Sequence, residues 1–257
     1  NGERDLDYYK TVQGIDWQDL LLKNAIVHNH NLSVRGGNEK TRYSLSGSIN
    51  DQDGVIINSG FRKYQGRAVI DQVVNNNLKI GLNMNYTYTR KYGTIVSESN
   101  ISPTTSLMYS MLGYRPVSSV RGEDLLNTKF DDETNPNADY RVNPLMAVNN
   151  EYNPLTTHNF IANAYLEWKI LNNLVLRVTG GYNRISQKKE VFFNSSSRLG
   201  HEHTNDKVNG SLTNIERTNL LNENTITYSP KLSKNHNLKL MGGFTIQDAR
   251  YHSDAIY

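Results

Sequence analysis

Two pairs of histidines are the first residues whose type and spacing could do chemistry. His28 and His30 stand two residues apart, as do His201 and His203, and imidazoles so placed can ligate a metal ion. Neither pair has an obvious third ligand nearby in the sequence. We therefore expect His28 and His30 to be part of a strand and His201 and His203 to lie in a solvated loop. A metal site is the alternative for the second pair.

Acidic residues offer two further kinds of chemistry. The run 131–139, DDETNPNAD, alternates side-chain oxygens that a hard cation could use, but it lacks the glycine and the final glutamate of a calcium loop. A solvated loop is the preferred interpretation and Ca²⁺ binding the alternative. Glu167 and Glu223 could act as a glycosidase pair only if about 5 to 9.5 Å apart, which the sequence does not reveal.

Motifs for covalent or nucleotide chemistry are missing from the sequence. No GxSxG, HExxH, GxxxxGK[ST] or GxGxxG run occurs, and there is no cysteine. The formal net charge of +3 is too small for a nucleic-acid binder. We therefore predict a protein that is not an enzyme, holds no metal or cofactor and binds no nucleic acid.

Aromatic residues in the longest segment without a strand pattern, 92–157, are the candidate ligand contacts. Binding residues favour loops held on a rigid scaffold, so ligand binding by this chain should concentrate there. The same rings could instead pack loop against loop. The five candidates are Tyr109, Tyr114, Phe130, Tyr140 and Tyr152.

The scaffold itself follows from alternating side chains. In residues 78–90, LKIGLNMNYTYTR, apolar or aromatic residues occupy the even positions from 78 to 88 and polar or small ones the odd positions, which indicates a strand with two opposite faces. Such a strand is about twice the ordinary length. The chain is therefore predicted to be all-β, with about eight strands. The other strands are expected near 27–35, 41–50, 61–72, 159–170, 174–183, 215–228 and 238–247.

The connections between these strands fall into two classes. Short turns rich in asparagine and glycine follow the odd strands, whereas long links follow the even ones. This asymmetry is typical of outer-membrane barrels, which have periplasmic turns and extracellular loops. The short turns lie at 36–40, 74–77, 171–173 and 233–237, and the expected extracellular loops at 51–60, 92–157 and 190–213.

Composition permits a membrane barrel and excludes a membrane helix. Only 37% of the residues are hydrophobic, and no run approaches the roughly 18 apolar residues of a spanning helix. A tilted strand needs only about 9 to 11 residues to cross, with one parity facing lipid and the other a wet lumen. The alternative is a soluble or secreted β-rich protein that binds carbohydrate or peptide. Residues 16–23, DWQDLLLK, predict one short helix capped by Asp16 that packs at the rim.

One stretch carries a family resemblance. Residues 16–60 contain DWQDLLLK, then HNLSVRGGNEKTRY, then DQDG, and they resemble the barrel start of SusC/RagA-like TonB-dependent transporters. That family's pattern there is approximately DW-x-D, HNLSVSGG-x-EKT-x-Y and a DQDG or NQEG loop. The segment NPLMAV, 143–148, is similar to the NPL segment of the family's next long loop. The resemblance runs from residue 16 to about 180.

The resemblance implies an antiparallel transmembrane β-barrel of 22 strands, of which this chain would be an internal portion. Residues 1–25 would be an extracellular-side lead-in and residues 26–257 a partial barrel in outer-membrane lipid of a Gram-negative bacterium. The implied function is TonB-dependent import of glycans or peptides. TonB would act through a plug and box outside this chain, and a SusD-like surface lipoprotein would be the partner. The aromatic candidates would then contact an oligosaccharide or a peptide.

Overall fold

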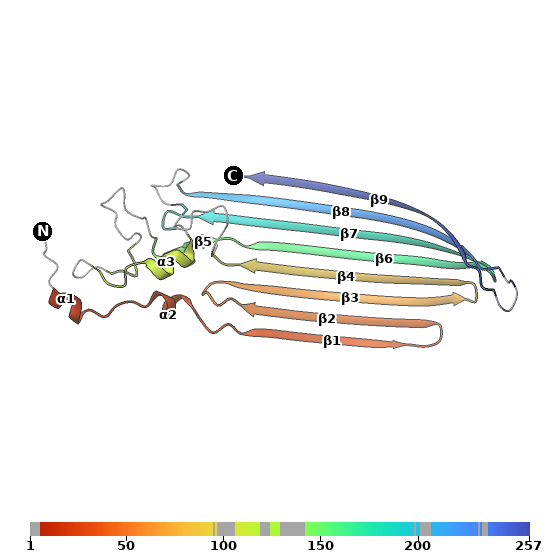
Figure 1. Cartoon of the computed structure of the whole chain (residues 1–257), viewed down its shortest axis with the longest axis horizontal. Helices are drawn as coiled ribbons and strands as arrows, with labels where there is room; N and C mark the ends of the chain where they lie inside the picture. Colours follow the sequence, from red (N-terminus) through yellow and green to blue (C-terminus); the bar gives the residue numbers. More distant parts are fainter. Residues whose placement is uncertain are drawn as a thin grey trace.

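The computed structural model describes residues 6–94, 96, 106–118, 124–128, 142–197, 199–200, 207–230, 232 and 236–257. Their main body is one antiparallel sheet whose long strands lie side by side in chain order (Figure 1). The predicted all-β class and the eight long strands are confirmed. A two-residue strand that the sequence did not predict, β5 (Glu151–Tyr152), pairs with the end of β7. The long strands are β1 (Val27–Gly37), β2 (Thr41–Asp53), β3 (Gly60–Asn75), β4 (Leu78–Tyr92), β6 (Leu155–Leu171), β7 (Leu174–Phe193), β8 (Asn209–Tyr228) and β9 (Leu240–Ile256).

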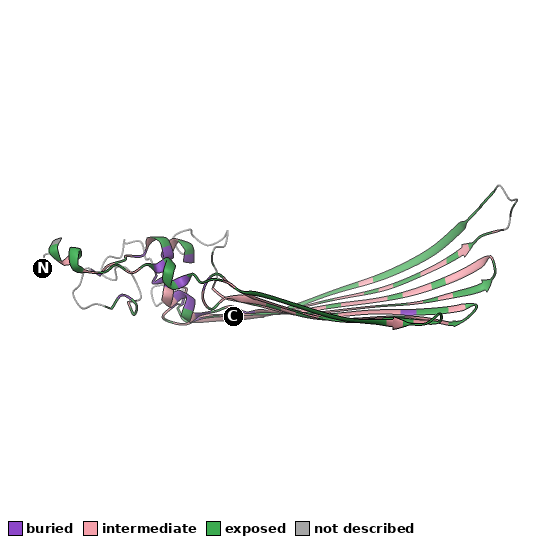
Figure 2. Cartoon of the chain, turned by 90° about the horizontal axis from the view of Figure 1, so that it is seen from below, coloured by how far each residue is buried: buried purple, intermediate pink, exposed green. Residues whose placement is uncertain are grey.

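The two ends of the sheet differ. The β1–β2, β3–β4, β6–β7 and β8–β9 connections lie at one end, here called the turn end. The other three links and the helices lie at the opposite end, here called the loop end (Figure 1). Viewed from below, the strands overlap near the loop end and fan apart toward the turn end, so the sheet is twisted and curved (Figure 2).

Several strands run farther toward the loop end than alternation predicted. β7 continues to Phe193 and β8 begins at Asn209, so both enter the expected loop 190–213. Beyond the apolar stretch of β7, both faces carry polar residues such as Ser186, Gln187 and Lys188. Alternation between polar and apolar residues gives no signal where both faces are polar.

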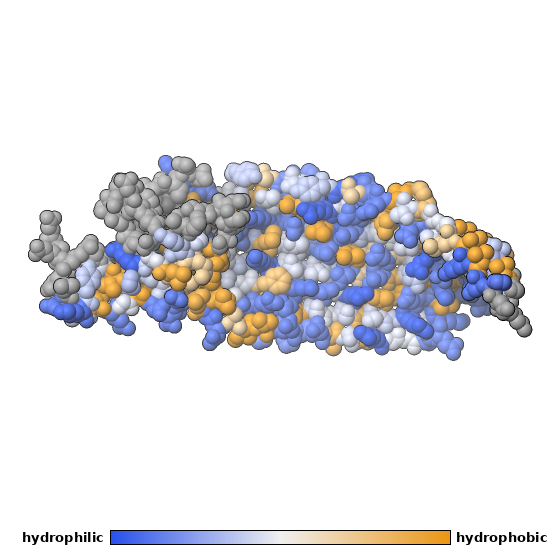
Figure 3. Space-filling view, viewed as in Figure 1, coloured by the Kyte–Doolittle hydropathy of each residue, from blue (hydrophilic) through white to orange (hydrophobic). Residues whose placement is uncertain are grey.

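The hydrogen-bonding register places all apolar parities on the same side of the sheet. Leu82 and Met84 of β4 pair with Ala164 and Ala162 of β6, and the next strands continue the rows. We call this side the apolar face. The other side, here the polar face, contains Asn83 and its neighbours in the same rows. Figure 3 looks onto the hollow side of the sheet, where hydrophilic residues predominate in the middle.

The apolar band slants across the strands. Counted from the turn end, the first charged residue on the apolar face is Arg62 on β3 and Asp248 on β9. The register puts Asp248 in one row with Ala68, six residues nearer the turn end than Arg62. An offset of six residues over five strand spacings is a tilt of about 40°, at about 3.3 Å per residue and about 4.8 Å between strands. Strands of membrane barrels tilt by this amount.

Aromatic side chains border the band on both sides. On its loop-end border, Tyr64 and Tyr88 lie 6.0 Å apart, and the Tyr86 hydroxyl is hydrogen-bonded to His158 Nδ1 at 2.7 Å. Trp168 borders the turn end. The stretch from Leu78 to Tyr88 spans about 25 Å at this tilt, the height of the apolar band of outer-membrane barrels.

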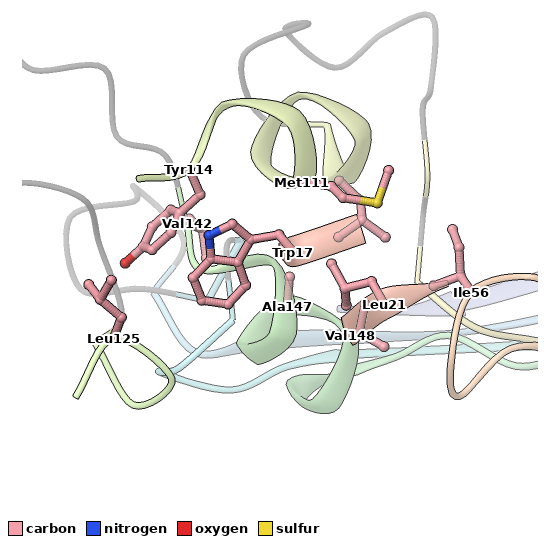
Figure 4. Packing of buried hydrophobic residues seen from close by; sticks show 10 residues of the cluster. Trp17, Leu21, Ile56, Met111, Tyr114, Leu125, Val142, Ala147 and Val148 are labelled. Atoms are coloured by element: carbon pink, nitrogen blue, oxygen red, sulfur yellow. The ribbon is translucent and has the colours of Figure 1, made fainter. Parts of the chain in front are cut away.

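Three short helices form a hydrophobic core beside the loop end of the sheet. α2 (Trp17–Leu21), α3 (Leu107–Gly113) and α4 (Pro144–Asn150) bring their buried faces together, while α1 (Leu6–Thr11) precedes them. Among the described residues, no helix is long and apolar enough to cross a membrane. Figure 4 shows the core packing. Its members are Trp17, Leu21, Ile56, Leu107, Met111, Tyr114, Leu125, Val142, Ala147 and Val148.

The DW pair of the lead-in explains how α2 joins this core. Asp16 caps the helix by accepting hydrogen bonds from the backbone N–H groups of Gln18 and Asp19, as predicted. Trp17 packs edge-to-face on Tyr114 at 5.2 Å, and its Nε1 donates to the Arg115 carbonyl at 3.1 Å. The lead-in is thereby attached to the long β4–β6 link.

Asn143 explains the NPL segment. Its carboxamide oxygen accepts from the backbone N–H groups of Leu145 and Met146 and so caps α4, while Pro144 occupies the first turn. Its Nδ2 lies 2.9 Å from the carbonyls of both Leu125 and Thr128. The side chain is completely buried, so one asparagine holds a helix start and a loop together.

Gly81 is required by close packing on the polar face of β4. The Tyr165 ring lies against it, and the Tyr165 hydroxyl donates to Asp71 Oδ1 at 2.8 Å. A Cβ at Gly81 would overlap that ring and lie 2.7 Å from Asp71 Oδ1. At Gly66, by contrast, a Cβ would meet nothing within 4 Å.

We predict that Asn143→Ala loosens the loop-end core. The change removes a helix cap and leaves buried carbonyls without a donor, at a cost of about 2 to 3 kcal/mol. Limited proteolysis of the full-length protein should cut this region much faster. Asn149→Ala, which removes an exposed asparagine that accepts a hydrogen bond from Asn58 Nδ2, is the matched control and should change little. Equal cleavage rates for the two variants would contradict this role of Asn143.

We also predict that Gly81→Ala destabilises the sheet while Gly66→Ala does not. Overpacking against Tyr165 should cost about 1 to 3 kcal/mol, whereas the added methyl at Gly66 meets open space. The unfolding temperature of the detergent-purified full-length protein reports the difference. If both variants unfold at the same temperature, close packing is not the reason for glycine at position 81.

Candidate ligand-binding groove

The loop end of the polar face carries a continuous row of registered residues. Gln52 pairs with Phe61, Phe61 with Lys91, Lys91 with Leu155, and Leu155 with Lys189. In antiparallel sheets, directly opposed residues share a face. These five side chains therefore form one line across β2, β3, β4, β6 and β7.

A groove of about 710 Å³ follows this row. All five row residues line it, and Thr94, Val96 and Asn153 of the long β4–β6 link close it on the loop side. Residues from five strands and two loop segments thus meet at one place. The volume is in the range of sites for small ligands.

The groove is positively charged. Lys91 and Lys189 are exposed and stand two strand spacings apart, about 10 Å. Asp53, which also lines the groove, pairs with Lys23 at 3.1 Å. Within the part of the chain that the structure describes, neither Lys91 nor Lys189 has a carboxylate partner. Two uncompensated ammonium groups in one groove favour an anion.

Basic residues also dominate the rest of the polar face. The acidic side chains lie toward the turn end, where Glu167 pairs with Arg177 at 3.6 Å and lies 3.9 Å from Lys79. The loop-end half of this face thus keeps only basic charges among its strand residues. The basic residues of the polar face are Arg35, Arg42, Lys63, Arg67, Lys79, Lys91, Lys169, Arg177, Lys189 and Arg217, and the acidic ones are Asp71, Glu167 and Glu223.

The three aromatic candidates that the structure describes, Tyr109, Tyr114 and Tyr152, do not line this groove. Tyr109 is half-buried in α3. Tyr114 is 3% exposed, packed on Trp17. Tyr152 is 49% exposed and pairs with Phe192, which the register places on the apolar face. Phe130 and Tyr140 lie outside the described residues. Ligand contact by these residues stays a prediction, and the burial of Tyr114 gives its ring a structural role.

The polar groups first considered for catalysis or metal binding have other surroundings. His28 and His30 stack at 6.3 Å on the apolar face of β1. Glu167 is held in ion pairs, and Glu223 lies opposite Thr179. In the described ranges, no group of three histidine, aspartate or glutamate side chains could hold a metal ion. His201, His203 and the run 131–139 lie outside these ranges.

Sequence reasoning missed Lys91 and Lys189 as site residues. Both follow the polar parity of their strands, and both stand near the end of a strand that precedes a long link. A basic residue at such a position could have been recognised from the sequence as a candidate for ligand binding. Their convergence was not visible, because it depends on β6 lying between β4 and β7 with Leu155 opposite both lysines.

Known proteins with similar sequences are TonB-dependent receptors. TonB-dependent receptor P26 of Formosa agariphila is 27% identical over 237 residues, which are 90% of this chain and 22% of that protein. TonB-dependent receptor SusC of Bacteroides thetaiotaomicron is 23% identical over 167 residues, 60% of this chain and 16% of that protein. The chain thus spans less than a quarter of the length of these relatives. No family model matches it.

The fold is also found in a solved transporter. The structure of the RagAB peptide importer in its closed-closed state superposes with a TM-score of 0.67 at 16% identity, covering 95% of this chain and 30% of the other. A second structure, of the RagAB peptide transporter, gives a TM-score of 0.63 with the same coverage. Sequence and fold together support the resemblance: this chain is similar to a portion of the barrel of SusC/RagA-like TonB-dependent receptors.

Proposed function

We propose that this chain forms part of the barrel wall of an outer-membrane importer that takes up oligosaccharides or peptides and does no chemistry on them. The observation that carries the proposal is the slanted apolar band with aromatic borders on one face of the sheet. A band about 25 Å high on strands tilted by about 40° fits the hydrocarbon layer of an outer membrane.

A soluble binding protein is the less favoured alternative. Monomeric soluble proteins rarely expose large contiguous apolar patches. Here large hydrophobic side chains remain exposed along the apolar face, among them Leu32 at 75% and Phe244 at 62%. In a membrane, lipid would keep these side chains away from water, whereas in a soluble protein they would stay exposed to it.

The polar face supports passage of a hydrophilic substrate. It is lined by asparagine, serine or threonine side chains in β2, β4, β6, β7 and β8 and by glutamine and charged side chains in β3, with the groove at its loop end. In the proposed orientation the turn end faces the periplasm and the loop end faces outside, as in other outer-membrane barrels. Residues 26–257 form the wall, and residues 1–25 enter from the extracellular side.

The partners follow from the relatives and are part of the proposal. A TonB-dependent receptor takes its energy from TonB, which we propose acts through a plug and box encoded elsewhere in the same protein. A SusD-like surface lipoprotein would cover the loop end, as pairing in SusC-like and RagAB systems suggests. The loop-end core of α2, α3 and α4 is the nearest surface for that contact.

Membrane insertion is tested by neighbouring substitutions on opposite faces. Met84→Arg places a charge in the middle of the apolar band and should cost about 2 to 4 kcal/mol, so less folded full-length protein should reach the outer membrane. Asn85→Arg adds the same side chain one residue later on the polar face and should leave that amount nearly unchanged. Outer-membrane fractionation measures both, and equal loss or equal retention would contradict the assignment of faces.

Import is tested by uptake in cells. Oligosaccharide or peptide uptake through the full-length protein should stop when TonB is inactivated, although the protein remains in the outer membrane. Uptake of labelled substrate by cells with and without functional TonB gives the answer. Uptake that persists unchanged without TonB would contradict active import.

A further inference from the structure

We infer that the groove at the loop end of the polar face binds the acidic groups of an anionic oligosaccharide. This inference rests on the proposed import function and specifies the class of its substrate. The groove combines a line of registered side chains, a volume of about 710 Å³ and two lysines without carboxylate partners among the described residues.

The positions of the two lysines set the charge pattern. Lys91 and Lys189 flank Leu155 in one row and reach into the groove from β4 and β7. The nearest acid in the lining, Asp53, is paired with Lys23. An extended ligand lying across the strands would meet ammonium groups about 10 Å apart, so it should carry repeated carboxylate or sulfate groups.

The surroundings favour a sugar over a peptide. The next row toward the turn end carries Asn50, Lys63, Thr89, Thr157 and Gln187, which offer amide and hydroxyl groups to ligand hydroxyls. An extended peptide typically binds by adding a strand to a free sheet edge, and the groove strands β2, β3, β4, β6 and β7 are each paired on both sides.

Phe61 adds an apolar platform beside Lys91. Its half-buried ring lies in the groove row between Gln52 and Lys91, so one ring face of a sugar could stack on it while acidic groups meet the lysines. A few polar groups with one aromatic surface are typical of small-ligand sites.

The inference is tested with the full-length protein in detergent, with its lipoprotein partner if the two co-purify. The probes are an oligogalacturonate, a neutral gluco-oligosaccharide of the same length and an oligoglutamate of the same charge, with calorimetry as the readout. The oligogalacturonate should bind at least about tenfold more tightly than the other two, and added salt should weaken it.

Lysine substitutions locate the effect. Lys91→Gln and Lys189→Gln should each weaken oligogalacturonate binding about three- to tenfold, because each removes one charge-assisted contact. The control is Lys188→Gln, which removes the same charge one residue away on the apolar face, where Lys188 pairs with Glu190 at 2.8 Å. It should leave affinity unchanged.

Three outcomes would overturn the inference. They are equal or tighter binding of the neutral sugar, tighter binding of oligoglutamate, and an equal effect of Lys188→Gln and Lys189→Gln. None of these would affect membrane insertion or TonB-dependent uptake. Failure of the proposed function would appear instead as loss of those two properties, so the two failures are distinguishable.

Discussion

The continuous antiparallel register is the constraint on which the rest of the structure depends. Within a membrane every backbone N–H and C=O must find a partner inside the protein, and strands meet this only by pairing without gaps. From β2 to β8, each long strand is paired on both sides. Because side chains alternate, a slip by one residue would exchange the two faces of a strand. The register therefore determines which residues form the apolar face and which form the polar face.

Two features on opposite sides of the sheet follow from that register. On the apolar face, the offset between the boundaries at Arg62 and Asp248 gives the strand tilt without any reference to a closed barrel. On the polar face, the register brings Lys91 and Lys189 to either side of Leu155. The band and the groove are thus two consequences of one pairing pattern, one near the middle of the sheet and one at its loop end.

The loop end depends on a different interaction, the burial of Trp17 and Asn143. Trp17 fixes the lead-in to the β4–β6 link, and Asn143 fixes the start of α4 to the segment 125–128. The link thereby gains a hydrophobic core of its own beside the sheet (Figure 4). This gives a physical reason for the DW and NPL segments, which sequence comparison could recognise but not explain.

Much of the sheet could be predicted from the sequence, because strands that face two different environments alternate between residue classes. Residues 78–88 illustrate this, since the even positions are apolar or aromatic and the odd positions are polar or small. β4 has the faces expected from this pattern. The ends of β7 and β8 could not be predicted, because both faces are polar there. The core and the groove were also hidden, since both join segments far apart in the chain. The contact between Tyr114, a candidate ligand residue, and Trp17 was hidden for the same reason.

The most direct test of the account is the accessibility of single cysteines placed along residues 78–90, in full-length protein otherwise free of cysteine and reconstituted in lipid. This chain itself contains none. Spin labels at even positions from 78 to 88 should be relaxed mainly by lipid-soluble oxygen, and labels at odd positions other than 81 mainly by a water-soluble nickel complex. The alternation should end near Arg90, where the apolar band ends. Similar accessibility of both parities to the nickel complex would contradict the two-faced wall.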